Sequence, residues 1–316
     1  MVRLAIVIVS WNTRELLARC IESLERALVD APFATQIVVV DNASHDGTPA
    51  MLREKFPNVE LIETGANLGF AGGNNVALRQ LLAMPNPPEY VFLLNPDTEV
   101  VEDAVQRMIA YLEAHPDVAV VGPRLRYPDG SIQPSRRRFP TPGVFFWEST
   151  PLEQWWRSNP WAQRYRMADT PDDIEQDVDW LVGAALLVRR SVIERAGLLD
   201  EGFLMYSEEL EWQQRIQRAS NGSAHRVVYL PDALILHHEG QSSAQAPAQR
   251  YINFQRSRIR HARMCYGAGF AMLLQAWLRL AYAVEYATEA AKWIVGHKRP
   301  LRAERMRVYR QVITHI

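Results

Sequence analysis

Two short polar side chains, Asn95 and Asp97, follow directly after a short, unbroken apolar run. The run, residues 90–94, consists of β-forming residues and predicts a fully buried strand of a parallel sheet. Pro96 ends the strand, because proline cannot donate to a ladder. In an open α/β sheet, ligands bind at the edge formed by the carboxyl ends of the strands, and a carboxylate there can hold a hard divalent cation. The alternative is that Asp97 starts a turn or caps a helix that opens near Val101.

Polar residues also follow the other strands expected in the first hundred residues. The expected elements are strands at 4–9, 36–42 and 59–63 and helices at 14–29, 51–56 and, after residue 75, to about 83. This alternation is typical of a doubly wound, mostly parallel α/β sheet flanked by helices, whose strand ends converge on one edge. The clusters expected at that edge are Ser10 with Asn12, Asp41 with Asn42, residues 67–75, and Asn95 with Asp97.

The types of residue in these clusters favour a ligand that carries a base and phosphate. Asp41 is placed to accept hydrogen bonds from a base or ribose, and Gly69, Gly72 and Gly73 let the backbone approach phosphate near a helix N-terminus. No Gly-x-Gly-x-x-Gly follows the first strand, which disfavours nicotinamide cofactors. The chain also lacks a Gly-x-x-x-x-Gly-Lys-Ser/Thr loop, which argues against ATPase chemistry.

Two later segments carry further candidates. Glu208 and Glu209 lie near the start of a helix expected at 204–218. Adjacent residues cannot share a helix face, so one carboxylate can enter a cleft as a general base; a solvated first turn is the alternative. His237 and His238 lie in an expected loop after a strand at 226–230, and neutral imidazole is a common metal ligand.

The composition is that of a globular chain of 316 residues. Cys20 and Cys265 show no motif spacing, which argues against a disulfide framework or a cysteine metal site and favours a reducing compartment. The apolar start at 4–9 is too short for a signal peptide and is expected to form the first strand.

The charge is unevenly distributed along the chain. From Arg250 onward there are 13 Lys and Arg against three Asp and Glu, whereas the preceding part has 22 basic and 33 acidic residues. Such a basic tail indicates an anionic partner, either nucleic acid or a phospholipid surface. The tail contains no recognised nucleic-acid-binding motif, so we expect no nucleic-acid partner.

The tail also predicts an amphipathic helix. We call its regularly spaced apolar residues the seam: Leu273, Trp277, Leu280, Val284, Ala287, Ala291 and Ile294. The longest charge-free run, between Arg263 and Arg279, is shorter than the roughly 20 residues that a membrane span needs, so we expect no bilayer crossing. The helix is expected to pack on the catalytic domain, to pair with a second subunit, or to lie on a membrane.

Seven stretches, taken together and in order, resemble glycosyltransferase family 2, whose fold is called GT-A, and most closely its rhamnosyltransferase-like branch. They are residues 6–12, 38–48, 67–75, 93–97, 180–184, 203–209 and 237–242. The resemblance covers about the first 265 residues. It implies a GT-A domain at 1–265, with a nucleotide-sugar half to about 122 and an acceptor half from 123, followed by the basic helical tail at 266–316.

The resemblance implies a nucleotide-diphosphate sugar as donor and Mg²⁺ or Mn²⁺ as cofactor. Asn95-Pro96-Asp97 stands in place of the family's Asp-x-Asp element, so Asp97 would bind the metal together with His237. The nucleotide sugar would contact Ser10, Asn12, Asp41, Asn67, Phe70, Gly72, Asn75 and Asn95.

The resemblance also places the catalytic base at Glu209, where the family has Asp. The longer side chain shifts the carboxylate by about one bond, a displacement that can matter greatly for catalysis. Trp180, Ala184 and Glu208 would contact the acceptor. In such an enzyme the base deprotonates the acceptor hydroxyl, which attacks the anomeric carbon from the opposite face and inverts it.

The implied function is transfer of a hexose, L-rhamnose from dTDP-rhamnose, to a lipid-linked saccharide at the cytoplasmic face of the membrane, in cell-surface polysaccharide synthesis. The alternatives are a UDP-sugar donor (galactofuranose or N-acetylglucosamine) or an inactive nucleotide-sugar-binding scaffold. Residues 123–179 are rich in proline, arginine and tryptophan and predict a lid or binding wall. Four tryptophans there could form an acceptor wall or a satellite core: Trp147, Trp155, Trp156 and Trp161.

Overall fold

The computed structural model describes residues 2–156, 158–219, 225–240 and 247–316. The chain divides into two compact units, which we describe separately. The sheet unit comprises Met1–Arg138, Thr170–Leu204 and Glu208–Ser242, and the helical unit comprises Phe139–Asp169, Met205–Ser207 and Ser243–Ile316. Residues 241 and 242 of the last family-like stretch lie outside the described residues.

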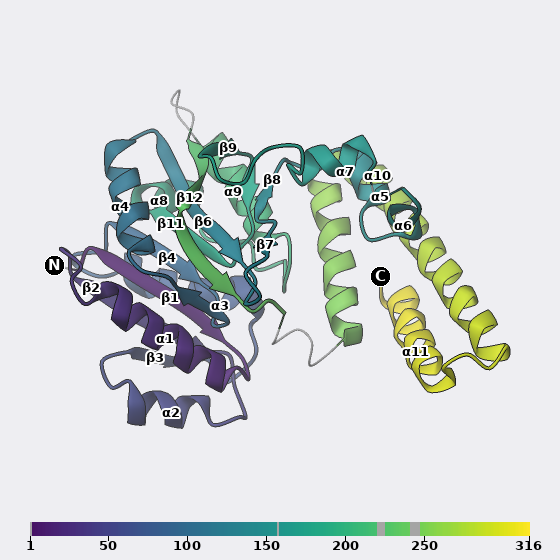
Figure 1. Cartoon of the computed structure of the whole chain (residues 1–316), viewed down its shortest axis with the longest axis horizontal. Coiled ribbons are helices and arrows are strands. Elements are labelled where there is room, and N and C mark those ends of the chain that lie inside the picture. Colours follow the sequence, from purple (N-terminus) through teal and green to yellow (C-terminus); the bar gives the residue numbers. More distant parts are fainter. Residues whose placement is uncertain (1, 157, 220–224, 241–246) are drawn as a thin grey trace. The chain divides into compact units, whose positions relative to one another are not determined.

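The sheet unit is built on a ten-stranded sheet in the order β3-β2-β1-β4-β11-β6-β12-β5, with β7 beside β6 and β9 beside β12 (Figure 1). Strand β1 is parallel to β2 and β4, β2 to β3, and β6 to β12. Strand β11 is antiparallel to its neighbours β4 and β6, and β5 is antiparallel to β12. This mixed, mostly parallel sheet confirms the predicted fold class.

The main strands lie close to the expected ranges in the first hundred residues and depart from them later. The strands are β1 (Leu4–Ser10), β2 (Thr35–Asp41), β3 (Glu60–Glu63), β4 (Tyr90–Leu94), β5 (Thr98–Val100), β6 (Val118–Arg126), β7 (Ile132–Gln133), β9 (Gln176–Val178), β11 (Ala185–Arg189) and β12 (Arg226–His237), with β8 (Arg136–Arg137) and β10 (Trp180–Leu181) forming a separate pair. The helices of this unit are α1 (Arg14–Leu28), α2 (Thr48–Lys55), α3 (Gly69–Leu82), α4 (Ala104–Ala114), α8 (Arg190–Ala196) and α9 (Glu208–Arg218).

The core of the sheet unit follows from the alternation of side chains along its central strands. Leu4, Ile6 and Ile8 of β1 are fully buried in one cluster with helix residues such as Leu17 of α1 and Met108 of α4. Each such side chain contributes about 1.5–3 kcal/mol through its burial. The packing therefore fixes β1 and its neighbours at the centre of the unit.

The other face of β1 is approached closely by α3. A Cβ on Gly73 would lie 2.6 Å from Cγ1 of Val9, far inside van der Waals contact. Glycine at this position therefore lets α3 sit directly on the strand whose end carries Ser10.

Strand β12 is longer than expected. The predicted strand ended at Leu230, but the register shifts between Leu230 and Leu234 and the strand continues to His237. A proline at such an irregularity does not have to donate to a ladder. The prediction of a loop at His237 is thus wrong, because this residue ends β12.

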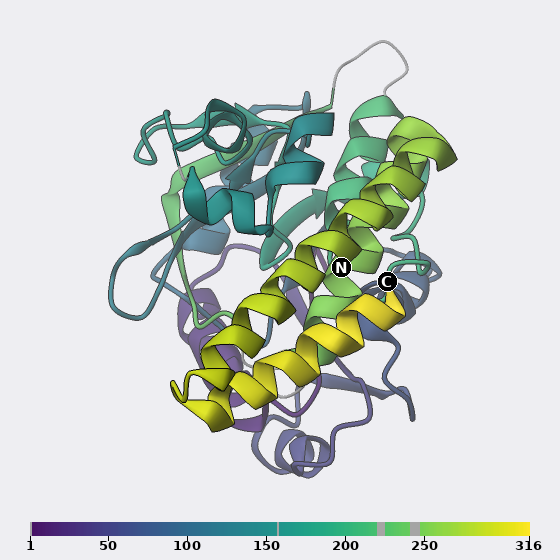
Figure 2. The same ribbon diagram turned by 90° about the vertical axis from the view of Figure 1, so that its right-hand side faces the viewer.

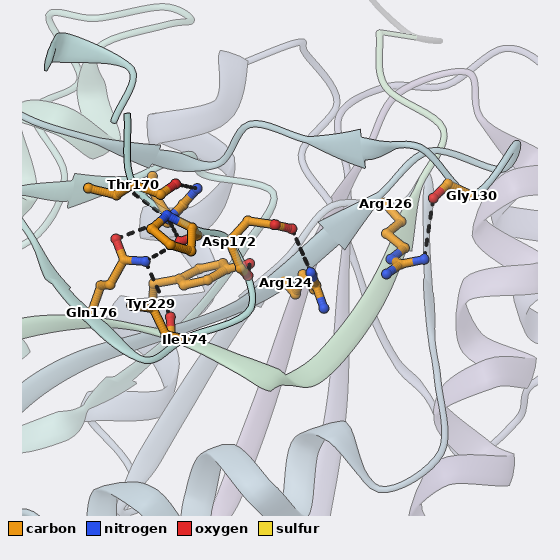
Figure 3. Close-up of polar contacts among 10 residues, drawn as sticks. Arg124, Arg126, Gly130, Thr170, Asp172, Ile174, Gln176 and Tyr229 are labelled. Atoms are coloured by element: carbon orange, nitrogen blue, oxygen red, sulfur yellow. Dashed lines mark hydrogen bonds and ion pairs between the residues drawn. The ribbon is translucent and has the colours of Figure 1, made fainter. Parts of the chain in front are cut away.

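Part of the proline- and arginine-rich stretch is tied to the sheet by ion pairs and hydrogen bonds (Figure 3). Arg124 of β6 donates to Asp172 at 2.6 Å, and the Tyr229 hydroxyl of β12 donates to the Asp172 carbonyl at 2.8 Å. The Arg136 guanidinium donates to Gln176 at 3.0 Å and lies over the Tyr229 ring at 5.0 Å. Residues 170–176 are therefore an anchored segment of the sheet unit.

The helical unit contains α5 (Pro142–Trp147), α6 (Pro151–Trp155), α7 (Pro160–Tyr165), α10 (Pro247–Ile294) and α11 (Arg299–His315). Helix α10 is two helices joined at Gly267, whose φ of 84° breaks the helical geometry. Helix α11 runs back along α10 (Figure 2). The expected domain boundary at residue 265 therefore falls within α10.

Most residues of the seam of α10 face solvent, but Trp277 packs on the buried cluster of the helical unit, as does a neighbouring face of the helix. Leu274, Leu278 and Tyr282 are buried in a cluster with Phe145 of α5 and Val312 of α11. The seam residues Leu273, Leu280 and Ile294 are 62%, 57% and 69% exposed. The helix therefore packs within the helical unit mainly through a face next to the predicted seam.

Among the described residues, α10 is the one helix that is long and apolar enough, by length and composition, to cross a membrane. Only 28% of its most apolar 18-residue window is buried. The sequence predicted no crossing because its longest run without any charge is short. The apolar window of α10 is longer because it includes a charged residue.

Three of the four tryptophans in the stretch 123–179 contact one another. The rings of Trp147, Trp156 and Trp161 meet edge to face at centroid distances of 5.5–6.3 Å. Trp156 and Trp161 remain about half exposed, and Trp155 is more exposed still. The cluster is therefore an aromatic surface as well as a small satellite core.

Candidate active site

Asp97 and His237 come together at the carboxyl end of β4. Asp97 lies in the short connection between β4 and β5, and His237 is opposite Thr98 in the β5–β12 ladder. Their side chains are 92–95% buried, and His237 Nε2 lies 3.2 Å from Asp97 Oδ1. Because β5 follows Asp97 directly and α4 begins only at Ala104, Asp97 does not cap the next helix.

A second set of contacts orients the histidine. Gln133 of β7 accepts from His237 Nδ1 at 2.9 Å, which leaves Nε2 as the acceptor that faces Asp97. The His238 backbone N–H donates to the Asp97 carbonyl at 2.9 Å. Two acceptor atoms held face to face in a buried position favour a proton or a metal ion between them; the Asn95 amide lies beside the pair, with Nδ2 3.5 Å from His237 Nε2. Gln133 was not predicted, because a two-residue strand has no detectable periodicity.

The donor set of this pair fits a metal ion that is completed by substrate and water. No group of three or more His, Cys, Asp or Glu side chains that could hold a metal occurs among the described residues. A structural zinc site would need four protein ligands. Mg²⁺ and Mn²⁺ instead accept one or two protein ligands and take oxygen atoms from water and phosphates. The residues present therefore fit Mg²⁺ or Mn²⁺.

Asp41 ends β2 beside the end of β1, where Ser10 is its partner in the parallel register. One carboxylate oxygen of Asp41 accepts from the Ser44 backbone N–H at 3.0 Å. The other, Oδ1, is buried and has no hydrogen-bond partner among the described residues. A buried acceptor without a donor is costly, so this oxygen is a natural partner for an N–H or O–H of a ligand.

The loop after β1 and the loop after β2 are joined through Asn12. Its side-chain oxygen accepts from the His45 N–H at 2.8 Å, and its backbone N–H donates to Ser44 Oγ at 3.0 Å. Ser10 Oγ lies 3.0 Å from Thr13 Oγ1. The structure thus brings Ser10, Asn12 and Asp41 together, with Asn12 holding the loops rather than pointing freely outward.

The start of α3 is built for close backbone approach. The Asn67 side chain accepts from the Gly69 N–H at 2.9 Å, and the Phe70 N–H donates to the Leu204 carbonyl at 3.1 Å. Gly69 has a φ of 72°, and a Cβ there would lie 2.1 Å from the Leu204 carbonyl oxygen. Only glycine is compatible with this contact.

Two residues expected to contact the nucleotide sugar are engaged within α3 or its neighbours. Asn75 is buried, and its amide exchanges hydrogen bonds with the Leu199 backbone at 2.9 and 3.0 Å and donates to Glu201 at 2.9 Å. A Cβ on Gly72 would meet the Leu68 Cβ at 2.9 Å. Asn75 therefore positions the 199–201 segment, and any effect on a donor would be indirect.

Glu209 lies in the first turn of α9, next to Phe70 and Gly183. A Cβ on Gly183 would lie 3.4 Å from the Glu209 side chain and 3.5 Å from the Phe70 ring. Burial raises the pKa of the Glu209 carboxyl, whereas backbone N–H groups and Arg137 oppose this shift. Its Oε2 atom is buried without a hydrogen-bond partner among the described residues. A partly desolvated carboxylate of raised pKa has the properties of a general base.

The remaining predicted residues border the same strands. The Ala184 carbonyl accepts from the Asn95 N–H at 2.9 Å, which fixes the start of β11 beside the end of β4. The Trp180 indole N–H donates to the Arg138 carbonyl at 3.0 Å, and Glu208 is buried. Gln213, which was not predicted, bonds both backbone groups of Leu181 at 2.8–2.9 Å and so fixes this segment on α9.

Comparison with known proteins identifies the fold and the family. The sequence profile of glycosyl transferase family 2 matches residues 5–196. The chain is 34% identical over 244 residues to an N-acetylglucosaminyl-diphospho-decaprenol L-rhamnosyltransferase of Mycobacterium tuberculosis, covering 74% of this chain and 78% of that protein. It is 26% identical to the low-salt glycan biosynthesis hexosyltransferase Agl10 of Haloferax volcanii, over 80% of this chain and 73% of that protein.

Among solved structures, the chain is similar to GalNAc-T7 with UDP, GalNAc and Mn²⁺, with a TM-score of 0.59 at 14% identity. This similarity covers 83% of the chain and about half, 48%, of that structure. S. aureus TarS gives a TM-score of 0.52 at 16% identity, over 88% of this chain and 43% of that structure. These similarities show the GT-A fold. The protein is thus a glycosyltransferase, and the chain belongs to glycosyltransferase family 2.

Proposed function

We propose that the chain is an inverting, metal-dependent rhamnosyltransferase that moves L-rhamnose from dTDP-rhamnose to a hydroxyl of a lipid-linked saccharide, for cell-surface polysaccharide synthesis. The observation that carries the choice of sugar and acceptor is the 34% identity to the L-rhamnosyltransferase of Mycobacterium tuberculosis, whose name specifies N-acetylglucosaminyl-diphospho-decaprenol. The site geometry is compatible with this reaction class.

In this proposal the donor diphosphate lies at the Asp97–His237 pair. A divalent cation held by these residues would offset the negative charge that develops on the departing diphosphate. Asp41, with its buried oxygen lacking a partner, would accept a hydrogen bond from the base or ribose. The close backbone approach at Gly69 would hold the loop beside the nucleotide.

Glu209 supplies the base. Its carboxylate takes the proton of the acceptor hydroxyl as that oxygen forms its bond to the anomeric carbon and the bond to the diphosphate breaks. A single displacement inverts the anomeric carbon and needs no enzyme nucleophile. The raised pKa of Glu209 means that more acidic solutions protonate the base and slow the transfer.

Nucleotide binding tests the donor. We expect dTDP with Mn²⁺ to raise the melting temperature, because a ligand at 100 times its Kd stabilises a folded protein by about 2.7 kcal/mol. Asp41→Ala should lose most of this shift, and Asp97→Ala should lose the part that depends on Mn²⁺. Asp232→Asn, an exposed carboxylate on the same strand as His237, is the matched control. Differential scanning fluorimetry measures all three.

The same measurement separates the alternatives. A larger shift with UDP than with dTDP would replace the donor by a UDP-sugar and keep the mechanism. A chain that binds dTDP-rhamnose but releases dTDP no faster than background, with each acceptor and metal tried, would be a scaffold rather than an enzyme.

We also infer that the seam of α10 contacts an anionic membrane surface, where the acceptor's lipid is held. The seam is apolar and solvent-exposed, and the residues from Arg250 onward carry a large basic excess. Apolar contact and basic charge are the two terms that hold a helix at a membrane interface.

Liposome flotation tests the membrane contact. We expect the double variant Leu273→Ser/Leu280→Ser to bind vesicles of anionic phospholipid about tenfold more weakly, because two exposed leucines are lost from the apolar contact. Val29→Ser, which removes an exposed apolar residue of the sheet unit, should bind like the wild type. Equal flotation of all three proteins, or equal binding to neutral vesicles, would refute the contact.

A further inference from the structure

A cavity of about 530 Å³ lies within the helical unit, lined by α10, α11, the start of α6 with the two residues before it, and Arg166 after α7. Its size is within the range of small-molecule sites. None of the residues assigned above to the metal, the nucleotide sugar or the base lines it. The cavity is therefore separate from the candidate active site, and the proposed transfer reaction assigns it no role.

One wall of the cavity is aromatic. The ring of Tyr282 is flanked by Tyr251 at 6.4 Å and by Tyr309 at 5.8 Å between centroids, with interplanar angles of 74° and 56°. Rings at such angles present faces and edges in several directions. An aromatic face is electron-rich and attracts the slightly positive C–H groups of a saturated ring.

The second wall is polar and offers both donors and acceptors. Gln255 donates to the Tyr282 hydroxyl at 3.0 Å, so the hydroxyl's own hydrogen can be donated to a ligand. Burial raises the pKa of Tyr282 to about 12, and this hydrogen stays in place at neutral pH. Glu285 makes no hydrogen bond or ion pair among the described residues and presents a carboxylate acceptor to the cavity.

The charges of the lining disfavour an anionic ligand. The one cation of the lining, Arg166, is paired with Glu153. Glu285 is then the charge left over, and it would repel a phosphate or carboxylate. Aromatic faces, a hydroxyl donor and a carboxylate acceptor together match a ring that has apolar C–H faces and hydroxyls at its edge.

We propose that this cavity binds one ring of a neutral saccharide, with the ring packed on Tyr251, Tyr282 and Tyr309 and its hydroxyls bonded to Glu285 and Tyr282. The proposal rests on the proposed function only in the choice of saccharide, which is the acceptor's sugar. The cavity would then hold the acceptor at a second point away from the reacting hydroxyl.

Saturation-transfer NMR on the full chain tests the binding, with N-acetylglucosamine and its β-1,4-linked dimer as probes. We expect transfer to both probes, and an affinity about tenfold weaker in Glu285→Gln, which loses a charged hydrogen bond. Tyr251→Ala should weaken binding in the same direction; Tyr251 is 44% exposed, so the variant is expected to fold. Glu304→Gln, which removes an exposed carboxylate of α11 outside this cavity, is the matched control.

Four results would overturn the proposal. Three of them are no transfer to either sugar, unchanged affinity in both cavity variants, and competition by tetramethylammonium at the concentration of the sugar, which would indicate an aromatic cation site. Asp97→Ala should retain binding while losing activity. Loss of sugar binding in Asp97→Ala would place the probe at the donor site and also overturn the proposal.

Steady-state kinetics then show whether the saccharide bound in the cavity is the acceptor. This test does not depend on the NMR result. If it is the acceptor, Glu285→Gln raises the acceptor KM about tenfold and leaves kcat and the donor KM unchanged. If only the free-sugar affinity changes, the cavity binds a separate saccharide, such as the growing polysaccharide. Absence of any transferase activity in the wild type would refute the proposed function and leave the NMR result standing.

Discussion

Asp97→Ala is expected to lower kcat about 10³-fold while the protein stays folded, equivalent to about 4 kcal/mol of lost transition-state stabilisation. Asp97 is one of two buried side chains that face each other at 3.2 Å with an acceptor atom on each side. Removing its carboxylate leaves a single imidazole, which is a poor site for a hard cation. Steady-state release of dTDP in the presence of Mn²⁺ measures the effect.

Two further variants make this prediction specific. Gln133→Leu leaves both proposed ligands in place but removes the acceptor that orients His237, and should weaken the apparent Mn²⁺ affinity about 10–100-fold with a smaller effect on kcat at saturating metal. Asp232→Asn should behave as the wild type. Full activity of Asp97→Ala with chelator present would show that the pair does not serve the reaction.

Glu209→Gln is expected to lower kcat about 10²–10⁴-fold, the usual range for loss of a general base. Glutamine preserves the size of the side chain but cannot take a proton. In the wild type, kcat/KM should fall as the pH drops below the raised pKa of Glu209. The pH at which this acidic fall occurs should lie above the ordinary glutamate value of about 4.5. The residual activity of Glu209→Gln should lack this acidic fall.

The same substitution should not destabilise the fold. The pKa of Glu209 is raised by burial, so the folded protein binds this proton more tightly than the unfolded chain does. Stability then decreases as the pH rises from the unfolded value of about 4.5 through the raised folded value. The buried carboxylate is unfavourable once it is ionised, and Glu209→Gln should then melt at the same or a higher temperature. A large loss of melting temperature would mean that inactivity reflects unfolding.

Glu209→Asp tests whether the exact position of the carboxylate matters in addition to its presence. It restores the residue that the family carries, with a shorter side chain. Activity within about tenfold of wild type would show that a carboxylate near this position suffices, since a misplacement of 1 Å can cost 10²-fold.

The strands of the first hundred positions, and the polar residues at their ends, were predictable because each is encoded locally. Residues 90–94 form an apolar run ended by proline, and the structure places β4 at those residues with Asn95 and Asp97 behind it. The convergence of Ser10 and Asp41 follows from parallel pairing of consecutive strands. No local pattern predicts Gln133, whose strand has two residues and acquires its role only by lying beside His237.

The buried face of helix α10 could not be predicted from the sequence either. Its apolar residues occupy more than one face, so periodicity finds the helix but cannot say which face will be covered. The structure buries Leu274 and Leu278 and leaves Leu273 and Leu280 in solvent. The choice is made by Phe145 and Val312, which come from other helices and contribute nothing to the local pattern.

The pairing of β12 with β5 has a consequence for how the enzyme is made. Asn95 and His237 are 142 residues apart, and the β5–β12 ladder that ends at His237 can form only after residue 237 has left the ribosome. Closing so distant a contact is among the slower events in folding a domain. A partly synthesised chain can pair β1, β2 and β4, but it has only Asp97 of the proposed metal pair.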